Sequence, residues 1–295
     1  MEEKQEIKKI IIPVAGMGTR FLPLSRAISK DFFPLIDKPV IQYIIEEVKR
    51  AGIKEIVFVT SPGQKAISNY FKKSPDLEEI LIKRKKDKIL KEMKDFEEIF
   101  EGISFSYVVQ KKPLGDGHAI LQASKATNGE PVAVSFGDDI IDSDEPAIAQ
   151  LISIFKTCNA PVIALKALPR EKITAYAGLT VEKIANRLYK IKKITEKPEL
   201  SQISSDLTIC GKYILTQEVF KYLKKAIPSK KGEIILAEVF DKMLSDGKII
   251  YGCELKGEWL ECGDKLKWLN SFFYLALKDP RFNNELKEYL KTLKY

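Results

Sequence analysis

The chain has few of the residues that would place it in several common protein classes. It contains four cysteines and one histidine among 295 residues. The cysteines, Cys158, Cys210, Cys253 and Cys262, lack both the paired spacing of a zinc site and the density of a secreted disulfide framework. We therefore expect reduced, mostly buried thiols and a cytoplasmic protein. His118 is the only histidine, and we expect it to have a structural role more than a catalytic one.

Long hydrophobic runs are absent as well. The apolar run that begins at residue 10 has only about six residues, and a charged segment precedes it. This is too short for a signal-peptide core or for a membrane span of ~20 residues. We expect no membrane partner.

The charge balance does not point to nucleic acid. An excess of 49 Lys and Arg over 41 Asp and Glu gives a net charge of +8, which suits either nucleic acid or small anionic substrates. The lysines alternate with acidic residues over 81–95, as on a solvated helix face. No zinc-finger, aromatic ribonucleoprotein or basic-zipper pattern is present. We therefore favour small anionic substrates and expect no nucleic acid partner.

Apolar runs alternate with helical patterns through the first half of the chain. Strands are expected at 10–14, 55–60, 105–110, 132–136 and 162–165, and helices at 40–50, 64–72, 117–124 and 148–156. This order predicts an α/β protein with three layers, in which helices cover both faces of a mixed, mostly parallel central sheet. Such a sheet binds ligands at the carboxyl ends of its strands.

The second half is less regular and reads as an extension of the same sheet. Strands are expected at 188–195, 207–215 and 249–255, and helices at 217–225 and 233–245. Two amphipathic helices, at 265–277 and 283–293, follow the last strand. They would pack either on the domain or on a second subunit, and periodicity does not separate these options.

The most informative segment is a glycine-containing loop after the first strand. Gly16 and Gly18 follow the apolar run and let backbone N–H groups approach an anion, while Arg20 and Lys30 supply cations for a polyphosphate. Phe21 stands where a dinucleotide fingerprint needs its third glycine, and no Walker lysine follows. An isolated Gly-x-Gly is also compatible with a plain strand-to-loop turn.

The wider pattern, with Pro34-Leu35-Ile36-Asp37-Lys38-Pro39, resembles the opening of the sugar-nucleotide pyrophosphorylases. The resemblance spans about 8–275 and is closest to the bacterial UTP–glucose-1-phosphate uridylyltransferases. It implies a Rossmann-like nucleotidyltransferase fold with a catalytic domain at 1–264, whose sugar-binding part is 160–264, and a helical extension at 265–295. It also implies a homo-oligomer, a dimer or a tetramer. The nucleotide contacts implied in this loop are Ala15, Gly16, Gly18 and Thr19.

A second loop, at 110–119, is a candidate for base recognition. Gln110 ends a strand, and the glycine at Gly115 can bring bare backbone to the edge of a pyrimidine. The loop resembles the base-binding loop of the same family, although Asp116 replaces a leucine there. An ordinary glycine turn is the alternative. We expect His118 to cap the following helix or to pack beneath the base, because a sugar phosphate needs no general base.

A metal ligand is expected where the strand at 132–136 ends in Gly137 and two carboxylates. Mg²⁺ on a nucleotide needs only one or two protein carboxylates. The resemblance implies that Asp138 binds this Mg²⁺, whereas Asp139 is expected to cap the next turn.

The sugar side is expected to depend on a Glu-Lys-Pro sequence. In the resembling family, Glu196 would accept from sugar hydroxyls and Lys197 would contact the sugar phosphate. On its own this tripeptide also occurs on many protein surfaces. Gly178, Ile209 and Gly211 match the remaining sugar-pocket positions of the family.

Besides Asp116, four departures from the family pattern deserve weight. Ser29 replaces a proline, Asp31 replaces a glutamate, and Ala177-Gly178 follows Tyr176 where the family has tyrosine-glycine. Glu261 replaces the aspartate before a cysteine-glycine pair, which lengthens that carboxylate arm by one methylene. These changes leave the identity of the sugar and any second metal ligand open.

The resemblance implies transfer of a uridylyl group from UTP to glucose 1-phosphate, with Arg20, Lys30 and Lys197 as the catalytic cations. The same reaction with dTTP or another sugar 1-phosphate is an alternative, because the loop at Gln110 and Gly115 does not exclude a 5-methyl group. A catalytically weak nucleotide-sugar sensor is a second alternative, and a nicotinamide dehydrogenase is a distant third.

Overall fold

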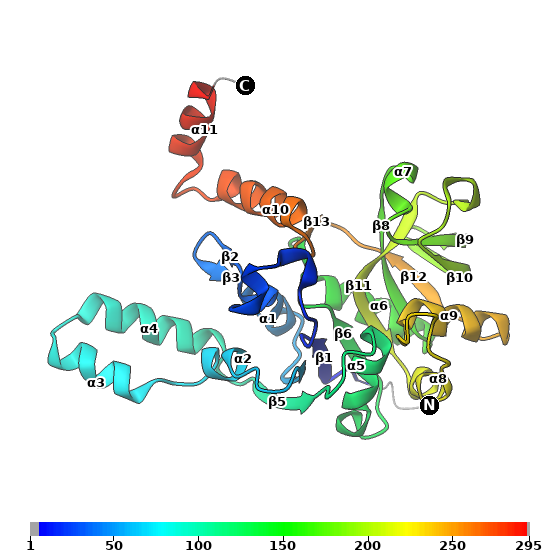
Figure 1. Cartoon of the computed structure of the whole chain (residues 1–295), viewed down its shortest axis with the longest axis horizontal. Helices are drawn as coiled ribbons and strands as arrows, with labels where there is room; N and C mark the ends of the chain where they lie inside the picture. Colours follow the sequence, from blue (N-terminus) through cyan, green and yellow to red (C-terminus); the bar gives the residue numbers. More distant parts are fainter. Residues whose placement is uncertain (1–5, 294–295) are drawn as a thin grey trace.

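The computed structural model describes residues 6–293, which contain a nine-stranded sheet with helices on both faces (Figure 1). The strands of this sheet are β1 (Lys9–Pro13), β4 (Glu55–Thr60), β5 (Ser104–Val109), β6 (Val132–Ser135), β8 (Val162–Ala167), β9 (Ala177–Ala185), β10 (Leu188–Glu196), β11 (Leu207–Leu215) and β12 (Tyr251–Glu254). Two further ribbons pair β2 (Pro34–Leu35) with β3 (Lys38–Pro39) and β7 (Asp139–Asp142) with β13 (Glu258–Glu261).

The helices connect these strands and extend beyond the last one. They are α1 (Val40–Arg50), α2 (Ala66–Tyr70), α3 (Pro75–Lys83), α4 (Asp87–Ile99), α5 (Asp116–Gln122), α6 (Ala147–Cys158), α7 (Arg170–Ile173), α8 (Gln217–Lys225), α9 (Leu236–Ser245), α10 (Lys265–Lys278) and α11 (Asn283–Thr292). Short 3₁₀ helices are η1 (Thr19–Phe21), η2 (Leu24–Arg26), η3 (Lys30–Phe32), η4 (Ala123–Thr127) and η5 (Leu200–Gln202).

The sheet is mixed, and most of its strands share one direction. Its order is β5-β4-β1-β6-β11-β8-β12-β10-β9. The pairs β5–β4, β4–β1, β1–β6 and β8–β12 are parallel, whereas β10 and β11 are antiparallel to their neighbours. A further pairing of β9 with β11, at Gly178 and Thr208, curls the C-terminal part of the sheet back on itself. The predicted α/β fold class is confirmed.

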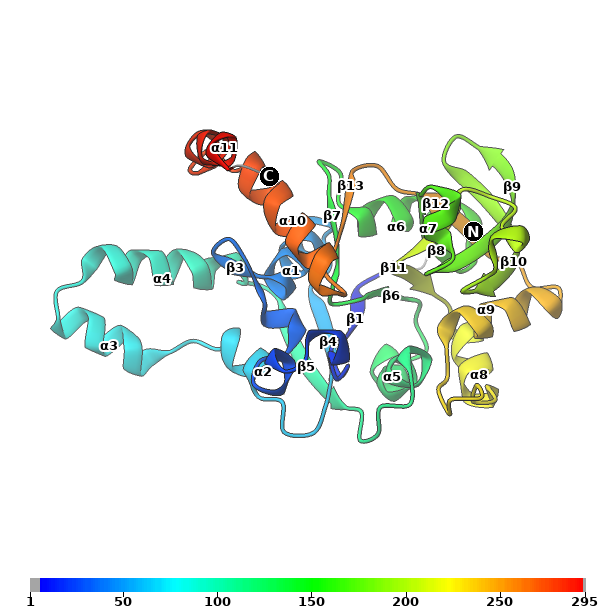
Figure 2. The same ribbon diagram turned by 45° about the horizontal axis from the view of Figure 1, so that its top comes forward.

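Two hydrophobic cores lie on opposite faces of the sheet because successive strand residues point in opposite directions. In β1, Ile10 and Ile12 belong to the core that contains α1 and α6, whereas Ile11 belongs to the core that contains α5, α8 and α9. Figure 2 shows α1 and α6 on one side of the sheet and α5 and α8 on the other. The chain therefore forms the three layers expected from its sequence.

Helix α1 illustrates how these layers are held together. Val40, Ile41, Ile44, Ile45 and Val48 repeat with helical periodicity, and all five are fully buried. Burial of such side chains stabilises the fold by about 1.5–3 kcal/mol each. This packing fixes the 3₁₀ helices and the β2–β3 ribbon that precede α1, which carry Lys30.

The parallel strands β5, β4, β1 and β6 end at one edge of the sheet. The loops that leave this edge begin at Gln110, Ser61, Val14 and Phe136. The chain therefore gathers the glycine loop, the Gln110 loop and Asp138 at a common edge, where open α/β sheets bind ligands.

Several strands and one turn were not predicted correctly. The helix at 40–50, the strands at 55–60 and 207–215 and the helix at 217–225 are confirmed. The sequence at 81–95 is not one helical face, because α3 ends at Lys83 and Lys85 adopts a left-handed backbone (φ 53°) before α4 begins. β7, β9 and β13 were missed. β7 and β13 have four residues each and pair only with each other, and most of β9 is exposed.

Two helical segments project from the body. The α3–α4 hairpin extends from one side of the molecule, and α10 leads to α11 at its periphery (Figure 2). Trp268 and Phe272 of α10 pack against the core, whereas α11 has no buried residue. In the part of the chain that the structure describes, no helix is long and apolar enough to cross a membrane.

Candidate active site

The glycine loop leaves β1 with its backbone open on one side. Nothing within 4 Å would meet a side chain at Gly16, so ligands can approach the backbone there. Gly18 has φ 59° and faces Ser25 and Lys30, where a Cβ would lie 3.1 Å from Ser25 Cβ. Gly18 thus allows the turn that leads into η1, which carries Thr19 and Arg20.

Lys30 lies at the centre of the site. It begins η3, and its ammonium forms a short ion pair with the Asp138 carboxylate, a residue 108 positions further along the chain. Burial opposes the charge of Lys30, but Asp138, with help from Asp31, outweighs that effect and raises its pKa above the ordinary value. Lys30 is therefore a fixed positive charge.

Asp31 is buried directly beside this lysine. It is 1% exposed, and Oδ2 accepts a hydrogen bond of 2.6 Å from Ser29 Oγ. Burial raises its pKa to about 6, although Lys30 and Ser29 act in the opposite direction. Two of the departures from the family pattern, Ser29 and Asp31, are thus hydrogen-bonded to each other beneath Lys30.

Arg20, Asp138 and Glu261 surround one point on the backbone. A methyl group placed on Gly263 would lie 3.1 Å from Asp138 Oδ2, 3.3 Å from Glu261 Oε1 and 3.5 Å from Arg20 Nη1. Arg20 also donates to the Gly263 carbonyl oxygen at 3.4 Å. Because Lys30 is paired with Asp138, the structure brings Arg20, Lys30 and Asp138 together as a mixed cluster of cations and carboxylates.

A cavity of about 680 Å³ adjoins this cluster. Ala15, Gly16 and Lys30 line it on one side, and the segment 61–66 after β4 lines it on the other. Ser61 and Gln64 close the latter segment, since both the backbone N–H and the hydroxyl of Ser61 donate to Gln64 Oε1. Sequence reasoning missed this wall, because it contains no charged or glycine-rich pattern beyond a common turn.

The Gln110 loop is held by its own contacts. Gln110 is 4% exposed, and its amide Nε2 donates to the Gly115 carbonyl at 3.1 Å and lies 2.9 Å from His118 Nδ1. Gly115 has φ 97°, and a Cβ there would come within 2.5 Å of the Ile234 carbonyl oxygen. His118 lies within α5 and contacts Gln110 and Gln122. The two predicted nucleotide contacts, Gln110 and Gly115, are thus adjacent.

Asp116, which replaces a leucine of the family pattern, accepts hydrogen bonds from two backbone N–H groups. Its Oδ1 accepts hydrogen bonds from the N–H groups of Gly117 (2.6 Å) and Leu236 (3.0 Å). Burial raises its pKa to about 6. The carboxylate therefore fastens the start of α5 to the start of α9.

The predicted sugar residues meet at the β9–β10–β11 junction. Glu196 ends β10 opposite Ala177, and Gly178 pairs with Thr208 of β11, next to Ile209. A Cβ at Gly178 would come within 2.8 Å of Pro198 Cγ. The close packing of Pro198, the proline of the Glu-Lys-Pro sequence, therefore favours glycine at position 178. Burial raises the pKa of Glu196, with Lys197 opposing the shift.

Lys197 is exposed and has an unusual backbone. Its φ is 46°, and its N–H donates to the Tyr176 carbonyl oxygen at 2.8 Å. This hydrogen bond stabilises the left-handed backbone conformation of Lys197.

The side chain of Asp139 occupies the space in which a side chain at Gly211 would lie. A Cβ at Gly211 would lie only 2.0 Å from Asp139 Oδ2, so no larger residue fits there. Asp139 is buried at the start of β7, and its Oδ1 accepts from Trp259 Nε1 at 2.7 Å. Burial, together with Asp138 and Glu261, raises its pKa to about 7. The expectation that Asp139 caps a turn is therefore wrong, because a strand begins there and pairs with β13.

A buried ion pair supports the cluster from below. Lys212 of β11 is 0% exposed, lies 2.9 Å from Glu47 of α1 and donates to Ser135 Oγ at 2.8 Å. Glu47 Oε1 also accepts from the N–H of Ile148 at 3.1 Å. The sequence carried no signal for this pair, since the two residues are far apart in the chain and lie in apolar segments.

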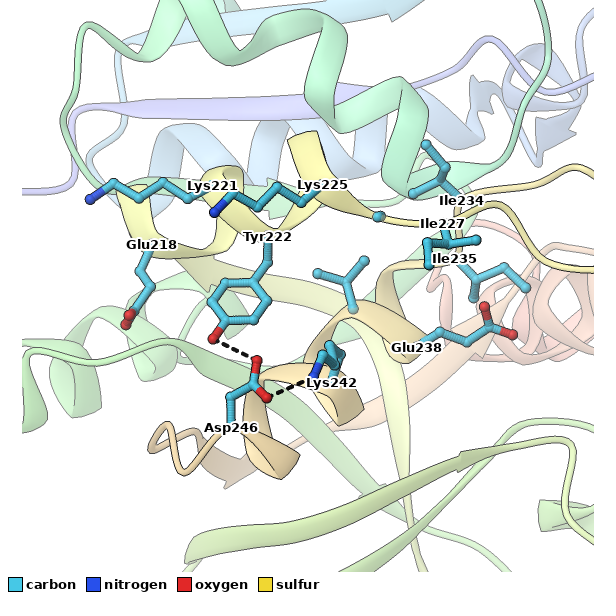
Figure 3. Close-up of a pocket in the computed structure, with 12 residues that line it drawn as sticks. Glu218, Lys221, Tyr222, Lys225, Ile227, Ile234, Ile235, Glu238, Lys242 and Asp246 are labelled. Atoms are coloured by element: carbon cyan, nitrogen blue, oxygen red, sulfur yellow. Dashed lines mark hydrogen bonds and ion pairs between the residues drawn. The ribbon is translucent and has the colours of Figure 1, made fainter.

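A second cavity, of about 510 Å³, lies between α8 and α9 (Figure 3). Tyr222, Ile234 and Val239 line it, and Asp246 accepts from Tyr222 and Lys242 at its rim. It contains none of the predicted site residues. Arg20, Lys30, Asp138 and Glu261 lie outside its lining.

The donor set suits a metal that is shared with a substrate. Among residues 6–293, no group of three or more His, Cys, Asp or Glu side chains forms a complete metal cage. Asp138, with Glu261 nearby, offers the one or two carboxylates that suffice for Mg²⁺ when phosphate and water complete its shell.

The family of the chain follows from comparison with known proteins. Residues 9–275 match the family model described as nucleotidyl transferase. The chain belongs to this family.

Two curated relatives are named as UTP–glucose-1-phosphate uridylyltransferases, and two similar solved structures are named as a UGPase and a UDP-glucose pyrophosphorylase. The chain is 38% identical to the UTP–glucose-1-phosphate uridylyltransferase of Staphylococcus haemolyticus, over 98% of this chain and 99% of the relative. It is 37% identical to UTP–glucose-1-phosphate uridylyltransferase 2 of Staphylococcus saprophyticus, with the same coverage. Among solved structures, UTP-bound UGPase from Acinetobacter baumannii is 31% identical with a TM-score of 0.88 over 98% of this chain and 100% of that chain. A UDP-glucose pyrophosphorylase complexed with UDP-glucose is 31% identical with a TM-score of 0.82, over 93% and 100%.

Proposed function

We propose that this protein transfers a uridylyl group from UTP to glucose 1-phosphate, giving UDP-glucose and pyrophosphate. The observation that carries this proposal is the approach of Arg20 and Asp138 to Gly263, with Lys30 paired to Asp138 and lining the cavity beside the open Gly16 loop. Relatives of nearly the same length that are named for this reaction support it.

The reaction needs positioning and charge more than proton transfer. A phosphate oxygen of glucose 1-phosphate attacks the α-phosphorus of UTP in line, the bond to the β-phosphate oxygen breaks, and pyrophosphate leaves. In our proposal Arg20 and Lys30 neutralise the departing phosphates, and Lys197 holds the incoming sugar phosphate. Juxtaposition of the two substrates alone can contribute ~7–11 kcal/mol to lowering the barrier.

The remaining contacts follow from the loops described above. We assign the nucleotide to Ala15, Gly16, Gly18, Thr19, Gln110 and Gly115, and the sugar to Gly178, Glu196, Lys197, Ile209 and Gly211. The family relationship supports use of a divalent metal, and we propose Mg²⁺ held by Asp138. When bound there it would neutralise phosphate charge.

The direct test is to incubate the purified chain with UTP, glucose 1-phosphate and Mg²⁺ and to measure pyrophosphate release and UDP-glucose. We expect stoichiometric formation of both. No pyrophosphate at saturating substrates would favour the sensor alternative. Parallel reactions with dTTP, and with other sugar 1-phosphates, establish which substrate pair has the highest kcat/KM.

We also propose that residues 1–264 form the catalytic domain, that 160–264 hold the sugar, and that 265–295 extend it. A homo-oligomeric protein, dimer or tetramer, in the cytoplasm completes the proposal. The four unpaired cysteines among the described residues support a reducing compartment. Light scattering of the purified chain tests the oligomeric state.

A further inference from the structure

A hydrogen bond joins Glu261, one of the departures from the family pattern, to Tyr176, the residue just before another departure. Tyr176 precedes the altered Ala177-Gly178 pair, and Glu261 replaces an aspartate that is one methylene shorter. The Tyr176 hydroxyl donates to Glu261 Oε2 in a short hydrogen bond, although 85 positions separate the two residues.

Both oxygens of the Glu261 carboxylate are engaged. Oε1 accepts from Lys267 Nζ of α10 at 2.7 Å, and this ammonium also lies 4.4 Å from the centroid of the Tyr176 ring. The ring packs against Trp259, with 5.5 Å between centroids. Burial and the Glu261 contact raise the pKa of Tyr176 to about 12, so the hydroxyl keeps its proton at neutral pH.

This carboxylate borders the catalytic cluster. Glu261 Oε1 and Asp138 Oδ2 approach the same side of Gly263, and Arg20 approaches it as well. The orientation of Glu261 therefore sets part of the field in which Arg20 and Asp138 act.

The backbone of Tyr176 contacts Lys197, a residue whose side chain we assign to the sugar phosphate. The Tyr176 carbonyl oxygen accepts from the N–H of Lys197, which has a left-handed backbone. One residue thus contacts Glu261 through its side chain and Lys197 through its main chain.

We propose that Tyr176 is a positioning residue for nucleotidyl transfer. Its hydroxyl holds the Glu261 carboxylate beside Asp138, and its carbonyl oxygen holds the backbone of Lys197. Lys267 of α10 holds the other oxygen of this carboxylate. The inference rests on the proposed transferase function. Removal of the hydroxyl leaves the main-chain contact to Lys197 and the contact of Lys267 with Glu261 Oε1 in place, but it frees Glu261 Oε2. We therefore expect the change to affect alignment in the transition state more than substrate binding.

The test compares Tyr176→Phe with the wild-type chain. We expect kcat to fall about tenfold to a hundredfold, as for loss of a hydrogen bond to a charged group, with KM for both substrates within about twofold. Tyr189→Phe is the matched control, because the Tyr189 hydroxyl donates to Glu254 at 2.8 Å away from the cluster. We expect this variant to retain wild-type kcat and a thermal midpoint similar to that of Tyr176→Phe.

A double-mutant cycle separates positioning from a general structural role. In Glu261→Asp the shortened side chain no longer reaches the hydroxyl, so we expect Tyr176→Phe to cause no further loss in that background. An equal loss in both backgrounds, or a Tyr176→Phe variant with wild-type kcat, overturns the inference while the transferase function stands. An inactive wild-type chain overturns the proposed function and this inference with it.

Discussion

Lys30 is the residue on which the charge of the site depends most directly. Its ammonium is paired with Asp138 on one side and lies next to the buried Asp31 on the other. It also lines the cavity that includes Gly16. A cation that is held in place before the substrate arrives needs little reorganisation when charge develops on the leaving phosphates.

Lys30→Ala should therefore lower kcat by about 10²–10³ without unfolding the protein. Steady-state kinetics and circular dichroism check both parts of this expectation. Lys38→Ala is the matched control, because Lys38 forms an ion pair of 3.0 Å with Glu46 and has no contact with the cluster among the described residues. Near-normal turnover of Lys30→Ala would rule out its proposed role.

Asp31 gives a prediction about pH. Its pKa is about 6 in the folded protein, above the ordinary value of 3.8. Protonated Asp31 thus contributes stability that is fully present below about pH 4 and is lost as the pH rises through about 6. The contribution is about 3 kcal/mol for about two pKa units. Denaturant unfolding at pH 4.5–7 should show a smaller decline for Asp31→Asn than for the wild type, and identical profiles would contradict the assignment.

At the scale of whole elements, α1 and β11 are joined by the buried Glu47–Lys212 pair. Lys212→Met should destabilise the protein by about 3–5 kcal/mol, since it leaves Glu47 buried without its partner. The double variant with Glu47→Gln should recover much of this loss, because glutamine is neutral and can still accept from Ile148. Free energies of unfolding from denaturant titrations test this, and equal stability of the single and double variants would argue against it.

The predictable elements were those with a clear hydrophobic pattern. The apolar residues of helix α1 follow the helical repeat, whereas strands β4 and β11 are short, mostly apolar runs that are buried along nearly their whole length. β7 and β13 were not predicted, since each has only four residues and exists because the other pairs with it. The turn at Lys85 was hidden within an evenly charged run that is compatible with one continuous helix.

The same distinction applies to the site. Gly16, Lys30 and Asp138 follow strand ends, and neighbouring parallel strands bring them to one edge, so their proximity was predictable. The contact of Tyr176 with Glu261 was not, because 85 positions separate the two residues. The contact of Lys267 with Glu261 spans only six positions, but it depends on how α10 packs after β13. Only the unusual residue at 261 drew attention to that region.

At the scale of the whole molecule, α10 and α11 differ in importance. Trp268 and Phe272 of α10 pack on the core, and Lys267 reaches Glu261, whereas α11 has no buried residue. A chain that ends at Phe282 should keep its kcat within about twofold of the full-length value, since loss of a peripheral helix leaves the site intact.

A chain that ends at Asp264 is the informative comparison. It lacks Lys267 and Trp268, so we expect lower thermal stability and little turnover. Full activity of this shorter chain would show that α10 contributes nothing to the centre.

The ribbon of β7 and β13 has a consequence for biosynthesis. The loop that carries Gly16 and Lys30 leaves the ribosome early, but Glu261 and Lys267 are added only after most of the polypeptide has been translated. A nascent chain therefore contains the glycine loop long before β13, which carries Glu261, has been made. A premature stop anywhere upstream of Glu261 should therefore yield a fragment without transferase activity, and not an enzyme that accepts a wider range of substrates.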